Sequence, residues 1–155
     1  MGADVSPATR PELAPQALHA LLREVFGYNQ FRGPQADIIG HVSQGGDALV
    51  LMPTGGGKSL CYQIPAIARQ RAGHGITVVV SPLIALLHDQ LRAATANGIR
   101  AATLTSVDTN REETIARFLN GELNLLYVAP ERASQQHFRD LLTRGRISLF
   151  AIDEA

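Results

Sequence analysis

The sequence contains little cysteine, few aromatic residues and no excess of charge of either sign. Its one cysteine, Cys61, excludes an internal disulfide and a cysteine-rich zinc site, and it fits a reducing compartment. The formal net charge at pH 7 is zero, so any contact with nucleic acid must come from local placement of basic residues. No apolar run has the length of a signal peptide or a membrane span. We therefore expect a cytoplasmic protein that does not bind a membrane.

The length and the apolar content favour one globular domain. Apolar residues make up 45% of the 155 residues, which is typical of a soluble protein with a packed core. Residues 1–14 are polar and contain proline, and they predict a disordered tail. Residues 15–155 are expected to form the single domain.

Apolar runs and helical periodicity alternate along most of the chain. Such alternation predicts an α/β protein with a mostly parallel sheet covered by helices on both faces. In such sheets ligands bind at the carboxyl ends of the strands. Strands are expected at 48–52, 76–80, 101–104, 123–128 and 147–152, and helices at 15–26, from 34 to the glycine pair at 45–46, and at 59–71, 83–97, 108–120 and 134–143. Asp108 is expected to cap the helix that begins there.

A glycine-rich segment, Pro53–Ser59, lies between an expected strand and an expected helix. This is the context of a phosphate-binding P-loop, in which backbone N–H groups surround phosphate at the start of the helix. Lys58 is expected to reach the β- and γ-phosphates as a catalytic residue, and the Ser59 hydroxyl to bind Mg²⁺. The predicted nucleotide-binding residues of this loop are Thr54, Gly55, Gly56, Gly57, Lys58 and Ser59. Met52 stands where the strict pattern has glycine.

An acidic pair, Asp153 and Glu154, follows the last apolar run. Phosphoryl transfer from ATP needs one carboxylate near Mg²⁺ and another that orients the attacking water. We assign Asp153 to the metal and Glu154 to the catalytic water. Together with the P-loop, this arrangement predicts ATP and Mg²⁺ as cofactors.

Four further segments resemble the motifs of RecQ-type DNA helicases of superfamily 2, as does the P-loop with its non-glycine first residue. They are Phe26–Arg32 followed by Gln35, then Lys58–Ala66, Ser81–Leu86 with Asp89 and Gln90, and Tyr127–Arg132. The resemblance covers about residues 18–155. It implies a P-loop NTPase fold of the RecA-like three-layer kind, with the carboxyl-terminal strands missing and the chain ending within the DExH box. The chain departs from the family pattern at Gly33-Pro34, Ala85 and His88.

The resemblance also implies roles for particular residues. Tyr28 and Arg32 would sandwich the adenine of ATP, and Gln35 would hydrogen-bond its edge. Ser81, Pro82 and Arg132 would contact a single DNA strand.

As a whole, the resemblance implies an ATP-dependent 3′ to 5′ DNA helicase that acts on single-stranded and duplex DNA in repair and recombination. A bacterial protein of this kind would associate with the nucleoid. Activity would require a second RecA-like domain in the same polypeptide, so we expect this chain to be an amino-terminal fragment that is inactive alone. Two alternatives stay open: a nucleotide- or nucleic-acid-binding module without turnover, and an RNA-directed helicase of the same superfamily.

Overall fold

The structure, a computed structural model, describes residues 11–46, 59–81, 84–105, 108–129, 131, 135–145 and 147–152. It consists of two compact units, Met1–Gly73 and His74–Ala155. The strand expected at 48–52 lies outside the described residues. The predicted α/β class is confirmed, because helices accompany a parallel four-stranded sheet.

The amino-terminal unit is built from helices. Helix α1, Pro15–Phe26, buries one leucine-rich face, as its periodicity predicts. It ends at Gly27, which adopts a left-handed φ of 75° and donates its N–H to the Arg23 carbonyl. A residue with a side chain rarely adopts this φ, so glycine is suited to the helix end.

Part of the expected disordered tail over 1–14 is ordered, whereas residues 1–10 lie outside the described residues. Pro11–Leu13 forms a short 3₁₀ turn, η2, and the Leu13 side chain is fully buried. The Leu13 carbonyl also accepts a hydrogen bond of 3.0 Å from the Gln44 side chain. Burial of this one leucine and its satisfied carbonyl account for the order of the turn.

Helices α2, Gln35–Ser43, and α3, Leu60–Arg71, pack against each other. Helix α2 begins one residue later than predicted, with Pro34 as its N-cap. The Arg69 guanidinium of α3 donates to the Ser43 carbonyl at the end of α2, at 3.0 Å, and burial lowers the pKa of Arg69. Burial also raises the pKa of the Cys61 thiol, which fits the role of a small apolar core residue.

The carboxyl-terminal unit contains a parallel sheet in the order β2-β3-β1-β4. Its elements are β1 Ile76–Val80, α4 Ile84–Ala96, β2 Ala101–Leu104, α5 Arg111–Leu119, β3 Leu125–Val128, α7 Gln136–Arg144 and β4 Ile147–Ile152. Strands β1, β2 and β3 are buried on both faces, which explains their continuous apolar sequences.

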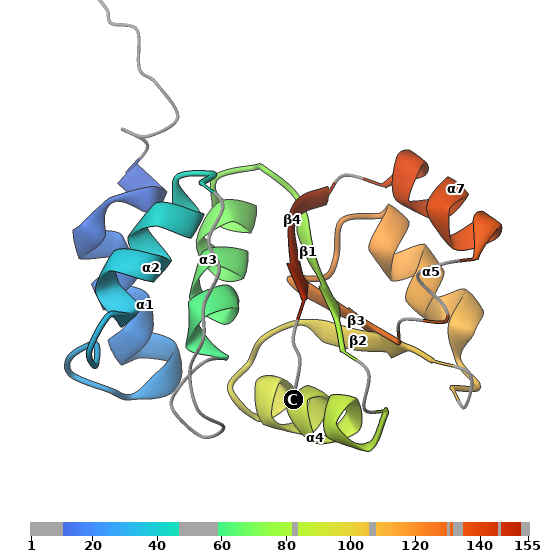
Figure 1. The fold of residues 1–155 in the computed structure, drawn as a ribbon, viewed down its shortest axis with the longest axis horizontal. Coiled ribbons are helices and arrows are strands. Elements are labelled where there is room, and N and C mark those ends of the chain that lie inside the picture. The colour runs from blue at the N-terminus through green and yellow to red at the C-terminus, as the bar shows by residue number, and fades with distance from the viewer. Residues whose placement is uncertain are drawn as a thin grey trace, which may run out of the picture. The chain divides into compact units, whose positions relative to one another are not determined.

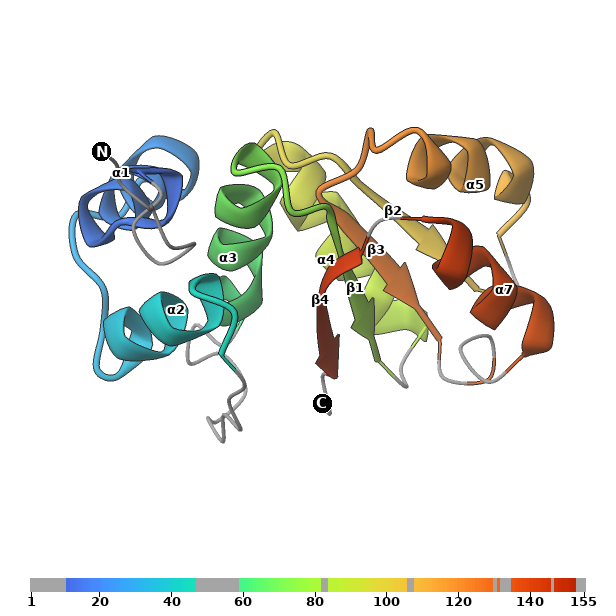
Figure 2. The ribbon, with the colours of Figure 1, turned by 90° about the horizontal axis from the view of Figure 1, so that it is seen from above.

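Helices cover both faces of this sheet. Alternate strand residues such as Val78, Leu104 and Leu126 join Phe118 of α5 and Phe138 of α7 in one apolar core. Helix α4 packs on β2 and β3 from the opposite face (Figures 1 and 2). Right-handed connections require this arrangement, because the chain moves across the sheet in one direction after β1 and in the other after β2 and β3.

Among the helices that the structure describes, none combines the length and the apolar character needed to span a bilayer.

Candidate functional site

The last residues of all four strands lie in one row across the sheet. Leu104 pairs with Val128, Val128 with Val80, and Val80 with Ile152. Because the strands are parallel, the segments that follow them leave from the same edge. These segments begin with Thr105, Ala129, Ser81 and Asp153, and three of the four strands therefore lead into motifs identified in the sequence.

The direction of the chain reverses between two neighbouring strands at this edge. After β1 the chain crosses to β2 through α4, whereas after β3 it crosses to β4 through α7 on the other face. In open α/β sheets ligands bind at such a reversal. The reversal lies between the ends of β1 and β3, where the segments after Ser81 and Ala129 begin.

Ser81 is fixed at this edge by its backbone. Its N–H donates to the Val128 carbonyl at 3.1 Å, and the residue is 0% exposed. The hydroxyl has no hydrogen-bond partner within the described part of the chain. A DNA contact through this hydroxyl requires movement of the atoms that cover it, and the DNA-binding role of Ser81 stays a prediction.

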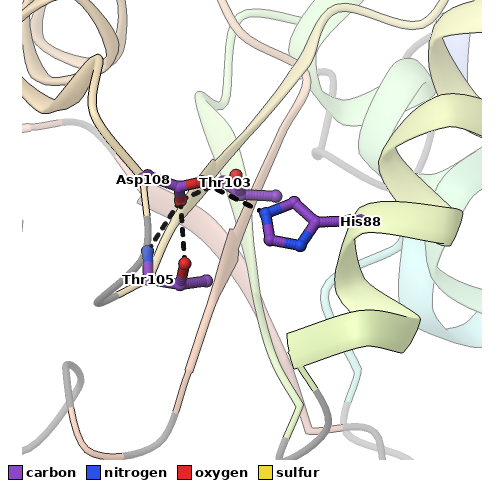
Figure 3. Close-up of polar contacts among 4 residues, drawn as sticks. All are labelled: His88, Thr103, Thr105 and Asp108. Atoms are coloured by element: carbon purple, nitrogen blue, oxygen red, sulfur yellow. Dashed lines mark hydrogen bonds and ion pairs between the residues drawn. The ribbon is translucent and has the colours of Figure 1, made fainter.

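A polar network at the end of β2 was not predicted (Figure 3). One oxygen of the Asp108 carboxylate, Oδ2, accepts hydrogen bonds from Thr103 Oγ1 at 2.9 Å, Thr105 N–H at 2.8 Å and Thr105 Oγ1 at 3.1 Å. The other oxygen, Oδ1, lies 3.1 Å from Nε2 of His88 on α4. The Asp108 side chain is 11% exposed, so the carboxylate is largely shielded from solvent.

The network explains both the pKa of Asp108 and an error in the predicted helix start. Burial alone raises the pKa of this carboxyl, but the hydrogen bonds from His88 and the two threonines outweigh burial and lower it. Because the carboxylate is engaged in this way, it does not cap α5, which begins at Arg111 with Asn110 as N-cap. The prediction that Asp108 starts the helix is therefore wrong.

In the amino-terminal unit, the three predicted adenine-binding residues differ in exposure. Tyr28 is 57% exposed and follows the end of α1, and Arg32 is also exposed. Gln35 is 1% exposed, and its Oε1 accepts the Arg32 N–H at 2.8 Å. Gln35 therefore holds the turn at residues 32–35, a role that the sequence did not indicate.

Ser59 precedes the first residue of α3. Its carbonyl accepts the Gln63 N–H at 2.9 Å, whereas its side chain makes no capping hydrogen bond. A serine hydroxyl and a carboxylate are both oxygen ligands of the kind that Mg²⁺ prefers. The Ser59 side chain is half-buried, and its metal-binding role stays a prediction.

The other predicted site residues lie outside the described residues. They are Thr54, Gly55, Gly56, Gly57, Lys58, Pro82, Arg132, Asp153 and Glu154. Within the described ranges, no group of three or more His, Cys, Asp or Glu residues is placed to hold a metal ion.

Comparison with known proteins identifies the family. Residues 32–155 match the DEAD/DEAH box helicase family. The chain is 44% identical over 143 residues to the ATP-dependent DNA helicase RecQ of Haemophilus influenzae, covering 91% of this chain and 22% of that protein. It is 41% identical over 139 residues to RecQ of Bacillus subtilis, covering 88% of this chain and 23% of that protein.

A eukaryotic relative shows the same relationship. The ATP-dependent helicase SGS1 of Saccharomyces cerevisiae is 43% identical over 141 residues, covering 86% of this chain and 10% of that protein. The chain thus spans about a fifth of the length of the bacterial relatives and less of the yeast protein. These relatives confirm the RecQ resemblance of the motifs, and the match over most of the chain shows that it belongs to the DEAD/DEAH box helicase family.

Proposed function

We propose that the full-length protein is an ATP-dependent DNA helicase of the RecQ type. It would couple ATP hydrolysis to 3′ to 5′ movement along single-stranded DNA and to duplex unwinding, in repair and recombination. The relatives named above are ATP-dependent helicases, and RecQ of Haemophilus influenzae and of Bacillus subtilis are DNA helicases by name. Residues 15–155 would belong to the first RecA-like domain.

The observation that carries this proposal is the row of strand ends. Val80, Val128 and Ile152 are register partners, and they precede the Ser81 segment, the Ala129–Arg132 segment and the Asp153-Glu154 pair. Three motifs far apart in the sequence therefore begin from one edge of the sheet. This placement supports a site in which bound DNA and the carboxylates of ATP hydrolysis can influence each other.

Different residues of the chain would contact the phosphates, the Mg²⁺, the attacking water and the adenine. Lys58 would bind the phosphates, and Ser59 and Asp153 would hold Mg²⁺, which neutralises phosphate charge when it is bound. Glu154 would orient the attacking water and accept its proton. The exposed Tyr28 ring and Arg32 side chain would stack on the adenine.

Turnover would also require groups that this region does not supply. We propose that a second RecA-like domain in the same polypeptide provides arginine side chains to the phosphates. Such a residue is worth about 10³–10⁵ in rate in related NTPases. Residues 1–155 alone should accordingly bind nucleotide weakly and hydrolyse it at near background rate.

A substitution of Lys58 tests the nucleotide site. Lys58 is the only lysine in the sequence. We expect Lys58→Ala in the full-length protein to abolish DNA-stimulated ATP hydrolysis and unwinding, because it removes the charge that faces the phosphates. The control is Arg71→Ala, which removes an exposed cation whose pairing with Glu24, at 3.8 Å, contributes little.

The same assay tests the substrate. Single-stranded DNA and single-stranded RNA of matched sequence are compared as stimulators of ATP hydrolysis, and a labelled duplex reports unwinding. Greater stimulation by RNA would favour the RNA-directed alternative. Retained hydrolysis in Lys58→Ala would refute the P-loop assignment, and nucleotide binding without any turnover in the wild-type protein would favour a binding module.

A further inference from the structure

The Asp108 carboxylate joins two segments that are distant in the sequence. Its Oδ2 holds its own turn through Thr103, within β2, and Thr105, directly after that strand. Its Oδ1 contacts His88 of α4, twenty residues earlier in the chain. Figure 3 shows the His88 ring reaching toward the carboxylate from the helix. We name these four residues the Asp108 bridge.

The position of Thr103 explains why the bridge forms on this side of the sheet. Leu104 belongs to the core shared with α5 and α7, so its neighbour Thr103 faces the opposite side, toward α4. Helix α4 packs on β2 from that side. The carboxylate that Thr103 holds therefore lies within reach of a side chain from α4.

The chemistry of the contact requires a donor at His88. An ionised carboxylate only accepts hydrogen bonds, so the hydrogen lies on Nε2 of the ring. The neighbouring charged groups on α4 do not compete for the ring, because Asp89 pairs with Arg92 one turn later. An uncharged side chain that still donates should therefore preserve the contact.

The bridge acts close to the end of β1. Helix α4 begins at Ile84, and His88 lies one turn further on. On the β1 side, the Ser81 backbone is tied to Val128 of the neighbouring strand. The chain is thus fixed at Ser81 by the sheet and at His88, in the second turn of α4, by Asp108.

We propose that Asp108 is a positioning residue for DNA binding, which it serves by fixing the amino-terminal part of α4 through His88. This inference rests on the proposed function, because it assumes that DNA binds beside Ser81 and the start of α4. The Thr103 and Thr105 hydrogen bonds hold the carboxylate in place, and His88 transmits that position to the helix. Loss of the His88 contact leaves the β2 turn intact but releases the helix.

The test compares His88→Ala with His88→Gln in the full-length protein. ATP hydrolysis is titrated with single-stranded DNA, which separates the KM for DNA from kcat. We expect His88→Ala to raise the KM for DNA about tenfold with kcat unchanged, the effect that one charge-assisted hydrogen bond has on an equilibrium. His88→Gln should retain the wild-type KM, because its amide still donates. Asp140→Asn, which changes an exposed acid on α7, is the control and should retain it too.

A double-mutant cycle separates the bridge from a general loss of stability. If Asp108 affects DNA binding only through His88, adding His88→Ala to Asp108→Ala raises the KM for DNA no further. Independent effects of the two substitutions, an unchanged KM in His88→Ala, equal increases in His88→Ala and His88→Gln, or an increase in Asp140→Asn would each overturn the inference. Should His88→Ala not fold, Asp108→Ala, which removes the acceptor of the His88 bond, replaces it, and an unchanged KM there overturns the inference as well.

The assay of the wild-type enzyme distinguishes a failure of the proposed function from a failure of the proposed role of Asp108. If DNA does not stimulate the wild-type enzyme, both the proposed function and this inference are overturned. If DNA stimulates the wild-type enzyme and the variants have the wild-type KM for DNA, only the role of Asp108 is overturned.

Discussion

Gly145 closes helix α7 at a place where the protein has no room for a larger residue. Its backbone, with φ of −95° and ψ of 167°, is open to any amino acid, so an alanine there causes no backbone strain. A Cβ atom at this position, however, would overlap Cε2 and Cζ of the Phe118 ring and lie 3.2 Å from Cδ2. Gly145→Ala is therefore a purely steric test of the core beneath α7.

The cost of this substitution follows from the surroundings of Phe118. The ring is 1% exposed and belongs to the core between the sheet, α5 and α7. Carbon atoms pack about 3.5–4.0 Å apart, so the ring must retreat by more than about 1 Å into atoms that already touch it. Overpacking of this kind costs about 1–3 kcal/mol, which for a chain of this size lowers Tm by about 2–12 °C.

Thermal unfolding of the wild-type chain, Gly145→Ala, Phe118→Leu and the double variant measures this cost. Leucine lacks the outer ring atoms, so the double variant should lose less stability than the sum of the two single variants. Full additivity, or a Gly145→Ala variant as stable as the wild type, would show that Phe118 does not pack against Gly145.

Three further predictions concern other parts of the molecule. Gly40→Ala, in α2 with open space around its Cβ, should raise the unfolding free energy by about 0.4–1 kcal/mol in urea titration, and a loss of stability would contradict the helix. The lowered pKa of Asp108 means that its ionised form stabilises the fold above the unfolded value of about 3.9 and that this contribution is lost as pH falls through the folded value. Asp108→Ala should therefore lower stability at neutral pH and flatten its acid dependence in urea titrations, and an unchanged acid slope would speak against the network. Gln35→Ala in the full-length protein should reduce the preference for ATP over GTP in hydrolysis assays, and an unchanged ratio would remove Gln35 from adenine recognition.

Local elements were largely predictable because their signals are local. The bounds of α1, β1, β2 and β4 agree with the sequence patterns, since periodicity and a terminal glycine act over a few residues. The order of the strands was not predicted. It depends on which buried strands pair, and β1 lies between β3 and β4 through contacts that no short pattern encodes.

The sequence predicted the parts of the site that are contiguous motifs. It did not predict contacts between residues that are distant in the sequence. Asp108 resembles a helix cap in the sequence, but three nearby hydroxyl and N–H donors and His88 compete successfully for its carboxylate. The one available signal was Thr105, three residues before the aspartate, a spacing at which an acidic side chain can accept a backbone N–H. The structural role of Gln35 could not be predicted for the same reason. Its burial and its hydrogen bond to the Arg32 backbone exist only in the folded turn.

The register of the sheet has a consequence for how sequences of this kind can vary. The four strands end in one row, so the length of each strand determines where the segment that follows it starts. Deleting one residue inside β1 would draw the Ser81 segment back by about 3.3 Å and turn every side chain after the deletion to the opposite face of the sheet. Insertions in the connections that enter the strands from the other edge would leave these positions unchanged. Length variation should therefore be tolerated before β2 or β3 and selected against within the strands themselves.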